Sequence, residues 1–402
     1  EAIRYLRTEA VGGIVMLVAA IIALILANSG AQDWYNNILE SRIGPHALHL
    51  DLTVSEWFAD GLLAIFFFVV GLELKRELVI GQLRSLKMAM LPVFAALGGM
   101  IVPGIIAFFI SRGIQDAEKA WSVPLATDIA FAVAVLAIAA SKLPSSVRIF
   151  LLSIAVVDDL GAILIIATVF TNDVDFIQLA IAVALLVLYA LLQKFRVQGP
   201  LSTFFYVPIG LGVWYFVHGA GIHATIAGVA LGLLTRVKKD PGEQEPPAIR
   251  VEHRVQPFSA GVVVPLFALS AAGITLTSSA VGEIFTNPLS IAIIVGLVIG
   301  KPIGVLLGAF VSVKTRLANL PHDLAWADIV AVGVIAGIGF TVSLLIAELA
   351  LPTNDSVALG KAAVLVASAI ASVLGAIVLA LRSRRVSQDS RDMANTIEHG
   401  AT

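Results

Sequence analysis

Long apolar runs separated by short polar segments dominate the chain. About 20 consecutive apolar residues are needed for a helix to cross a bilayer. On that criterion the pattern predicts an all-α polytopic membrane protein, with residues 1–402 forming a single integral membrane transporter domain and about twelve transmembrane helices. We place the spans at roughly 10–28, 54–72, 89–110, 121–140, 147–170, 176–193, 203–217, 221–235, 257–276, 288–313, 326–350 and 357–381.

The distribution of Lys and Arg predicts the orientation of these spans. Suppose that the N-terminus is cytoplasmic. Of the 26 Lys and Arg residues, only Arg42, Arg112, Lys119 and Lys361 then lie on the external side of the membrane, and Lys301 lies within a span. Cytoplasmic loops carry the excess of basic residues in membrane proteins. We therefore expect both termini to be cytoplasmic.

Two segments outside the spans carry further predictions. The short alternation in Ala47–Leu52 is typical of a β-hairpin strand on the external side, although an irregular loop fits the pattern equally well. Residues 386–402 are polar and follow the last span, so we expect a disordered cytoplasmic tail.

The amino-acid composition supports an integral membrane protein and excludes several other classes of protein. The chain is 58% hydrophobic and 13% charged, whereas soluble domains average about 25% charged. The net charge of −2 argues against a nucleic-acid partner. Since there is no Cys, the chain has no disulfide, thiolate metal site or Cys nucleophile.

Five ionisable residues lie inside the apolar runs, where burying one charge costs about 2.5–3.5 kcal/mol. Asp158 and Asp159 are adjacent at the middle of their span. Neighbouring helical residues point about 100° apart, so one acid can face a cavity and a cation while the other meets a second helix. Lys301, also at mid-span, is the obvious partner, and geometry alone does not say for which acid. Asp60 lies near the end of its span and fits a water-accessible structural acid equally well.

Two spans carry signals of interrupted helices. Pro124 removes a helix donor just before Thr127 and Asp128, and Gly337 and Gly339 permit unwinding in the eleventh span. Each break lies in the second helix of a three-helix unit, spans 3–5 and spans 10–12, and the two units have opposite orientation. That arrangement is typical of inverted-repeat transporters. Asp128 can balance the positive end of a broken helix and Lys301 the negative end.

This arrangement of residues predicts coupled antiport of a small cation against protons. Hard carboxylate and carbonyl oxygens favour a small hard cation, and protons compete for the same carboxylates, so loading one expels the other. Two other functions use similar parts. An intramembrane aspartyl protease needs acids on separate helices, which does not fit an adjacent pair. An ion-coupled carrier of an organic solute uses similar inverted repeats, and only its substrate distinguishes it.

Nearly the whole chain resembles the NhaA-type Na⁺/H⁺ antiporters, whose inverted repeats are well known. Six motifs carry the resemblance, and their order along the chain makes it specific. They are the segments 71–77, 126–131, 155–162, 221–225, 300–304 and 337–341.

The resemblance implies a non-enzymatic, pH-activated antiporter of the bacterial inner membrane. It would expel Na⁺ or Li⁺, import a larger number of protons, need no cofactor and form a homodimer through an external β-hairpin. Asp159 would be the main cation ligand, and Asp158 would pair with Lys301 and share in ion and proton binding. Thr127 and Asp128 would lie where the two interrupted helices cross. The residues tied to pH sensing would be Glu73, Arg76, Glu77, His223, Glu252 and His253.

Two positions depart from the family pattern. Ala271 stands where better-known members have Asn, and Gln256 stands where a second histidine is expected. Both bear on the pH profile and not on the exchange reaction.

Overall fold

The computed structural model describes residues 2–139, 143–171, 174–197, 202–241, 243–276 and 278–400, and it is almost entirely helical. Within these residues, eight helices are long and apolar enough to cross a membrane, or ten if each of two bent helix pairs is one span. The two other predicted spans are α9 (Thr203–Gly219) and α10 (Thr225–Leu234). With 10 residues, α10 is about 15 Å long, half of a hydrocarbon core.

The first half of the chain contains five of these long helices. Its elements are α1 (Ala2–Ala27), α2 (Gln32–Glu40), α3 (Val54–Glu56), η2 (Trp57–Leu62), α4 (Leu63–Val79), η3 (Gln82–Arg84), α5 (Leu86–Ser111), η4 (Ala120–Leu125), α6 (Ile129–Ala139), α7 (Ser145–Val169) and α8 (Phe176–Lys194).

The second half contains the remaining long helices. Its elements after α10 are α11 (Pro247–Phe258), η5 (Ser259–Val263), α12 (Val264–Ala271), α13 (Ser278–Thr286), α14 (Pro288–Val295), η6 (Gly296–Gly300), α15 (Lys301–Lys314), α16 (Trp326–Ala336), α17 (Phe340–Ala350) and α18 (Asn354–Gly400).

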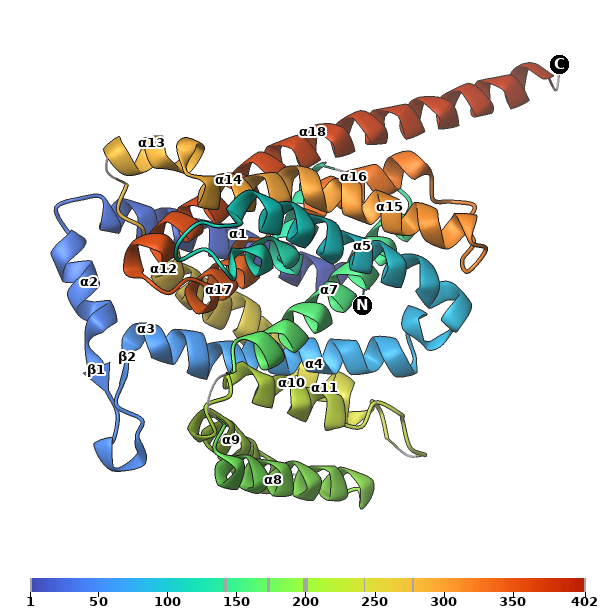
Figure 1. Ribbon diagram of the computed structural model, residues 1–402. Helices are drawn as coiled ribbons and strands as arrows, with labels where there is room; N and C mark the ends of the chain where they lie inside the picture. The colour runs from blue at the N-terminus through green and yellow to red at the C-terminus, as the bar shows by residue number, and fades with distance from the viewer. Residues whose placement is uncertain are drawn as a thin grey trace.

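Figure 1 shows how these helices are arranged. The pair α8 and α9 forms a layer at one edge, next to α10 and α11, and α18 runs along the opposite edge. Helix α8 exposes most of its apolar side chains, since only 11% of its most apolar stretch is buried, as expected of a helix that faces lipid. The core lies around α5, α7, α15 and α17. Helix α18 is assigned through Gly400. Whether residues 386–402 form a disordered tail, as the sequence led us to expect, stays a prediction.

A small hairpin projects on the side opposite the C-terminus (Figure 1). Strands β1 (Arg42–Ile43) and β2 (Leu52–Thr53) are antiparallel, with Ile43 opposite Leu52. The predicted strand Ala47–Leu52 is wrong except for its last residue. Its first residues belong to a 3₁₀ turn, η1 (His46–Leu48), because Pro45 and a left-handed His49 bend the chain.

Helices α5 and α15 pack backbone against backbone through glycines. A Cβ at Gly304 would collide with the carbonyl oxygen of Gly98, and one at Gly308 with that of Phe94. Small residues allow such close approach in membranes, where packing and not water exclusion holds helices together. Just before this contact lies the π-helical turn η6, so the helix geometry changes directly before Lys301.

The close contact generates a stability prediction. We expect Gly308→Ala to lower the free energy of unfolding by about 1–3 kcal/mol, because the new methyl group meets backbone that cannot move aside. The melting temperature in detergent is the measurement. Gly261→Ala is the matched control, since a Cβ there meets nothing within 4 Å. Equal melting temperatures for the two variants would contradict the predicted role of this contact.

Candidate ion-binding site

Asp158 and Lys301 form an ion pair at the centre of the molecule. Asp158 lies on α7, Lys301 is the first residue of α15, and both side chains are completely buried. The Lys301 ammonium also donates a hydrogen bond to the carbonyl oxygen of Leu125, the last residue of η4. A helix ends with unsatisfied carbonyls and a partial negative charge, so the lysine stabilises this end as well as the acid.

Thr127 connects the ion pair to the second interrupted helix. Its hydroxyl oxygen lies 2.6 Å from Asp158 Oδ2 and 2.8 Å from the carbonyl oxygen of Ala336, the last residue of α16. The hydroxyl carries a single proton, so it donates to one of these acceptors at a time. The negative ends of both broken helices therefore meet the same group of three side chains.

Asp128 binds the N-terminal ends of α6 and α17, which carry partial positive charge. Its Oδ1 accepts a hydrogen bond from the backbone N–H of Phe131 in the first turn of α6 (2.9 Å). Its Oδ2 accepts one from the N–H of Thr341 in α17 (3.1 Å) and one from the Thr341 hydroxyl (2.5 Å). Its own N–H donates to the carbonyl of Ile338 (2.7 Å). One carboxylate thus caps two helix N-termini inside the protein.

The breaks themselves lie at the residues with the weakest helix preference. Pro124 has non-helical backbone angles, and Ala126 is extended before α6 begins. Between α16 and α17, the chain bends by 49° over Gly337–Gly339. The two interrupted stretches contact each other through the Asp128 N–H and the Ile338 carbonyl, so each break supplies a partner for the backbone of the other.

The Asp159 carboxylate makes no hydrogen bond within the part of the chain that the structure describes. Its side chain is 1% exposed, and neither carboxylate oxygen has a hydrogen-bond partner among the residues that the structure describes; the same holds for Asp158 Oδ1. Buried polar atoms are almost always hydrogen-bonded, and a buried unpaired charge is neutralised. The charge on these oxygens can be neutralised by binding a proton or a monovalent cation. A site that can bind either one is a site where proton and cation compete.

Most of the predicted pH-sensing residues lie at another site, where α4 meets α11. Arg76 donates to Glu252 Oε1 at 2.5 Å, and Glu252 is fully buried. Glu73 and Glu77 lie within electrostatic range of Glu252, and Glu73 also lies within range of Asp159. His253 instead faces Glu245, 3.7 Å away, on the exposed side of α11.

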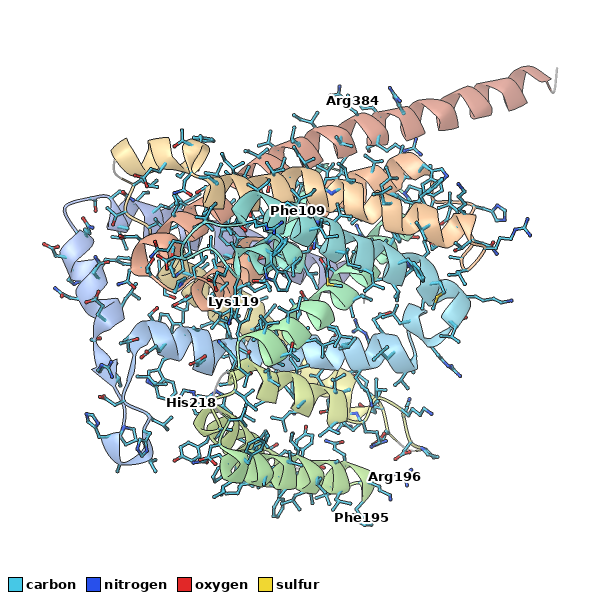
Figure 2. All side chains as sticks on the ribbon, in the orientation of Figure 1. Phe109, Lys119, Phe195, Arg196, His218 and Arg384 are labelled. Carbon is cyan, nitrogen blue, oxygen red and sulfur yellow. The ribbon has the colours of Figure 1, made fainter. Side chains whose placement is uncertain are left out.

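His223 belongs to a third group. Its Nε2 lies 3.4 Å from Asp60 Oδ1, and His218 Nδ1 lies 3.8 Å from the other oxygen of that acid. Trp214 donates to the backbone carbonyl of Asp60 (2.8 Å). Figure 2 shows His218 near the end of α9, away from the α4–α11 contact. The structure therefore does not bring His223 together with Glu252.

Sequence reasoning missed two contributors to the central site. Thr341 binds Asp128, and Ser368 on α18 accepts the N–H of Phe340 at 3.1 Å. The signal for Thr341 was its place directly after the glycine-rich break. Ser368 carried no signal, because a serine in an apolar helix usually bonds its own backbone.

Comparison with known proteins gives a consistent family. A family model described as Na⁺/H⁺ antiporter 1 matches residues 3–379. The chain is 53% identical to Na⁺/H⁺ antiporter NhaA 1 of Saccharopolyspora erythraea, over 95% of this chain and 92% of the relative. It is 52% identical to NhaA 2 of Rhodococcus jostii, over 96% and 93%. It is 51% identical to NhaA of Nocardia farcinica, over 98% and 93%.

The buried ion pair predicts a cost for removing one partner. We expect Lys301→Ala to destabilise the protein by about 3–5 kcal/mol, because Asp158 is then buried without a cation. The melting temperature in detergent measures this. Adding Asp158→Asn should recover most of the loss, since it removes the uncompensated charge. Lys314→Ala, at the exposed end of the same helix, is the control. A Lys301→Ala protein that melts like the wild type would disprove the stabilising role of the pair.

Proposed function

The chain belongs to the Na⁺/H⁺ antiporter 1 family, and we propose that it expels cytoplasmic Na⁺ or Li⁺ in exchange for a larger number of external protons. As a member, it is a transporter of the bacterial plasma membrane and not an enzyme. Na⁺ and H⁺ are its transported substrates, and the exchange needs no cofactor.

Asp159 is the residue on which the proposed mechanism depends. It is buried without a hydrogen-bond partner in the described part of the chain, so its carboxylate is available to a cation or a proton. We assign Asp159 as the main Na⁺ ligand. Asp158, with one oxygen on Lys301 and Thr127 and the other without a partner, joins in ion and proton binding. Because the two ions compete for these oxygens, release of one accompanies loading of the other.

Alternating access would arise from two inverted repeats. In this proposal spans 3–5 correspond to α5, η4–α6 and α7, and spans 10–12 to α14–α15, α16–α17 and α18. The break in the middle member of each unit supports the assignment, as in other inverted-repeat transporters. With α9 and the short α10 counted, the proposed topology has twelve membrane segments and both termini cytoplasmic.

Two further properties belong to the proposal. The cluster of Arg76, Glu252, Glu73 and Glu77 would sense cytoplasmic pH, because Glu73 couples it electrostatically to Asp159. The external hairpin would join two copies as a homodimer. Ile43, 59% exposed at its strand edge, supports a role in binding another chain.

Reconstituted vesicles test the exchange and its ligand. A Na⁺ gradient should drive proton movement with no organic solute present, and the KM for Na⁺ should fall as pH rises, because fewer protons then compete. Asp159→Asn should abolish exchange yet keep the wild-type melting temperature, since its carboxylate makes no hydrogen bond to a described residue. Asp33→Asn, on the exposed face of α2, is the control. Exchange that required an organic solute would favour the solute-carrier alternative, and wild-type Na⁺ affinity in Asp159→Asn would refute the ligand role.

The pH-sensing cluster generates its own prediction. We expect Arg76→Gln to move half-maximal exchange to higher pH by about one unit, because losing the cation makes the potential around Glu252 and Glu73 more negative. Exchange rates at saturating Na⁺ across a pH series measure the shift. Lys75→Gln removes the same charge from the neighbouring position and should leave the profile in place. Equal shifts in both variants would attribute the effect to surface charge in general.

A further inference from the structure

A cavity of about 770 Å³ lies at the ends of α4 and α11, apart from the Asp158–Asp159 site. One wall is formed by residues 78–80 at the end of α4 and by Arg84. The other is formed by residues 237–239 together with Pro246 and Ile249 at the start of α11. The mechanism proposed above uses no residue of this cavity.

Three basic side chains border the cavity, and all three are exposed. Arg84, Lys238 and Lys239 make no side-chain hydrogen bond or ion pair to any residue within the described part of the chain. They therefore present a net charge of about +3 to whatever enters. Charges of one sign beside a cavity attract an anion.

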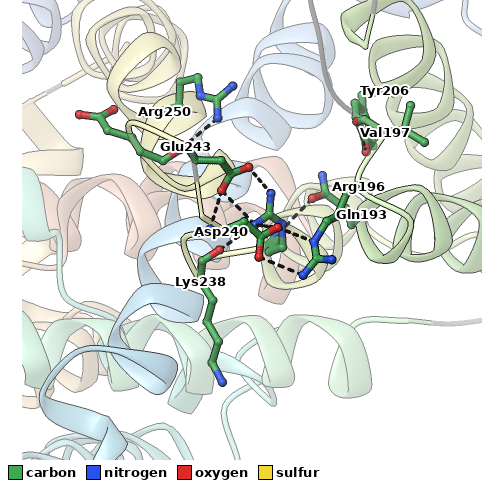
Figure 3. Close-up of polar contacts among 10 residues, drawn as sticks. Gln193, Arg196, Val197, Tyr206, Lys238, Asp240, Glu243 and Arg250 are labelled. Carbon is green, nitrogen blue, oxygen red and sulfur yellow. Dashed lines mark hydrogen bonds and ion pairs between the residues drawn. The ribbon is translucent and has the colours of Figure 1, made fainter.

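The acids of the same loop are already engaged elsewhere. Arg236 binds Asp240 at 2.8 Å and Glu243 at 2.5 Å, and Arg196 donates to Asp240 Oδ1 at 3.0 Å. Figure 3 shows this network, with the Lys238 side chain pointing away from it. Arg236 and Arg196 occupy these two carboxylates, and the third acid of the loop, Glu245, lies 3.7 Å from His253. Each acid of the loop therefore has a partner other than the cavity lysines.

The rest of the lining is apolar and lies where two membrane segments end. Leu78 and Ile80 are 45% and 47% exposed, and α11 opens the apolar segment Pro247–Ala271. A free phosphate ion would neutralise the basic groups but leave these apolar side chains in water. A lipid satisfies both, since its headgroup is charged and its acyl chains cover apolar surface.

From this combination we propose that the cavity binds an anionic phospholipid. Arg84, Lys238 and Lys239 contact the headgroup phosphate, and residues 78–80 with Ile249 contact the first part of the acyl chains. The bound lipid joins the end of α4 to the start of α11. This site is independent of ion exchange and is tested without it.

Thermal melting of the purified full chain in neutral detergent tests the proposal. Phosphatidylglycerol should raise the melting temperature more than phosphatidylcholine does, and inorganic phosphate should have no effect. The combined variant Arg84→Gln, Lys238→Gln and Lys239→Gln should lose most of the phosphatidylglycerol increment. Its melting temperature without lipid should match the wild type, because no side-chain hydrogen bond or ion pair to a described residue is removed. Native mass spectrometry should show the phosphatidylglycerol affinity falling by about tenfold or more.

Two control variants make the result specific. Arg316→Gln, Arg384→Gln and Arg385→Gln together remove three exposed positive charges, one just after α15 and two within α18, and should keep the increment. Figure 2 shows Arg384 on α18, on the side of the molecule opposite α8 and α9. Arg84→Lys, Lys238→Arg and Lys239→Arg keep the charge and should also keep it. Equal stabilisation by both lipids, an equal effect of inorganic phosphate, or an undiminished increment in the cavity variant would overturn the proposal.

Discussion

Neither charge of the Asp158–Lys301 pair has access to water, so each exists only because the other lies beside it. The surrounding packing serves this requirement. The glycine contact between α5 and α15 brings the lysine-bearing helix close, and the π-turn η6 ends directly before Lys301. The interruption after η4 exposes the Leu125 carbonyl that takes a second lysine hydrogen bond. A buried pair contributes little net stability compared with apolar packing, so its value lies in fixing where these helices meet.

The remaining charges of the core follow from the two helix breaks. A break creates a positive and a negative end in a medium that can stabilise neither. Asp128 meets both positive ends, and Lys301 with Thr127 meets both negative ends. Of the two adjacent acids Asp158 and Asp159, only Asp159 makes no hydrogen bond or ion pair that holds the described helices together. A site that must hold and release an ion needs such an acid, because carboxylate oxygens engaged in structure are unavailable to the ion.

The sequence revealed the parts of this core better than their contacts. Apolar runs located eight to ten of the twelve predicted spans, and the rarity of intramembrane charge drew attention to Asp158, Asp159, Asp128 and Lys301 without any structure. Which acid Lys301 meets depends on the rotation of two helices about their axes, and periodicity does not determine that. The binding of Thr341 to Asp128 joins residues more than 200 positions apart. The strand expected at Ala47–Leu52 begins later, at Leu52, because a single proline and a left-handed residue decide where a short strand begins.

The number of residues in the π-turn before Lys301 determines the direction in which the lysine side chain points. Its two glycines face other backbone closely: a Cβ at Gly296 would meet the Pro124 ring, and one at Gly300 would meet Pro103. A π-turn holds one more residue than a regular turn, so deleting a residue there would restore an α-helix. Everything on one side of the deletion would then rotate by about 100° and shift by about 1.5 Å. Lys301 would turn away from Asp158 although every side chain of the pair remained. A deletion of one residue in η6 would therefore separate Lys301 from Asp158 as effectively as a substitution of either residue.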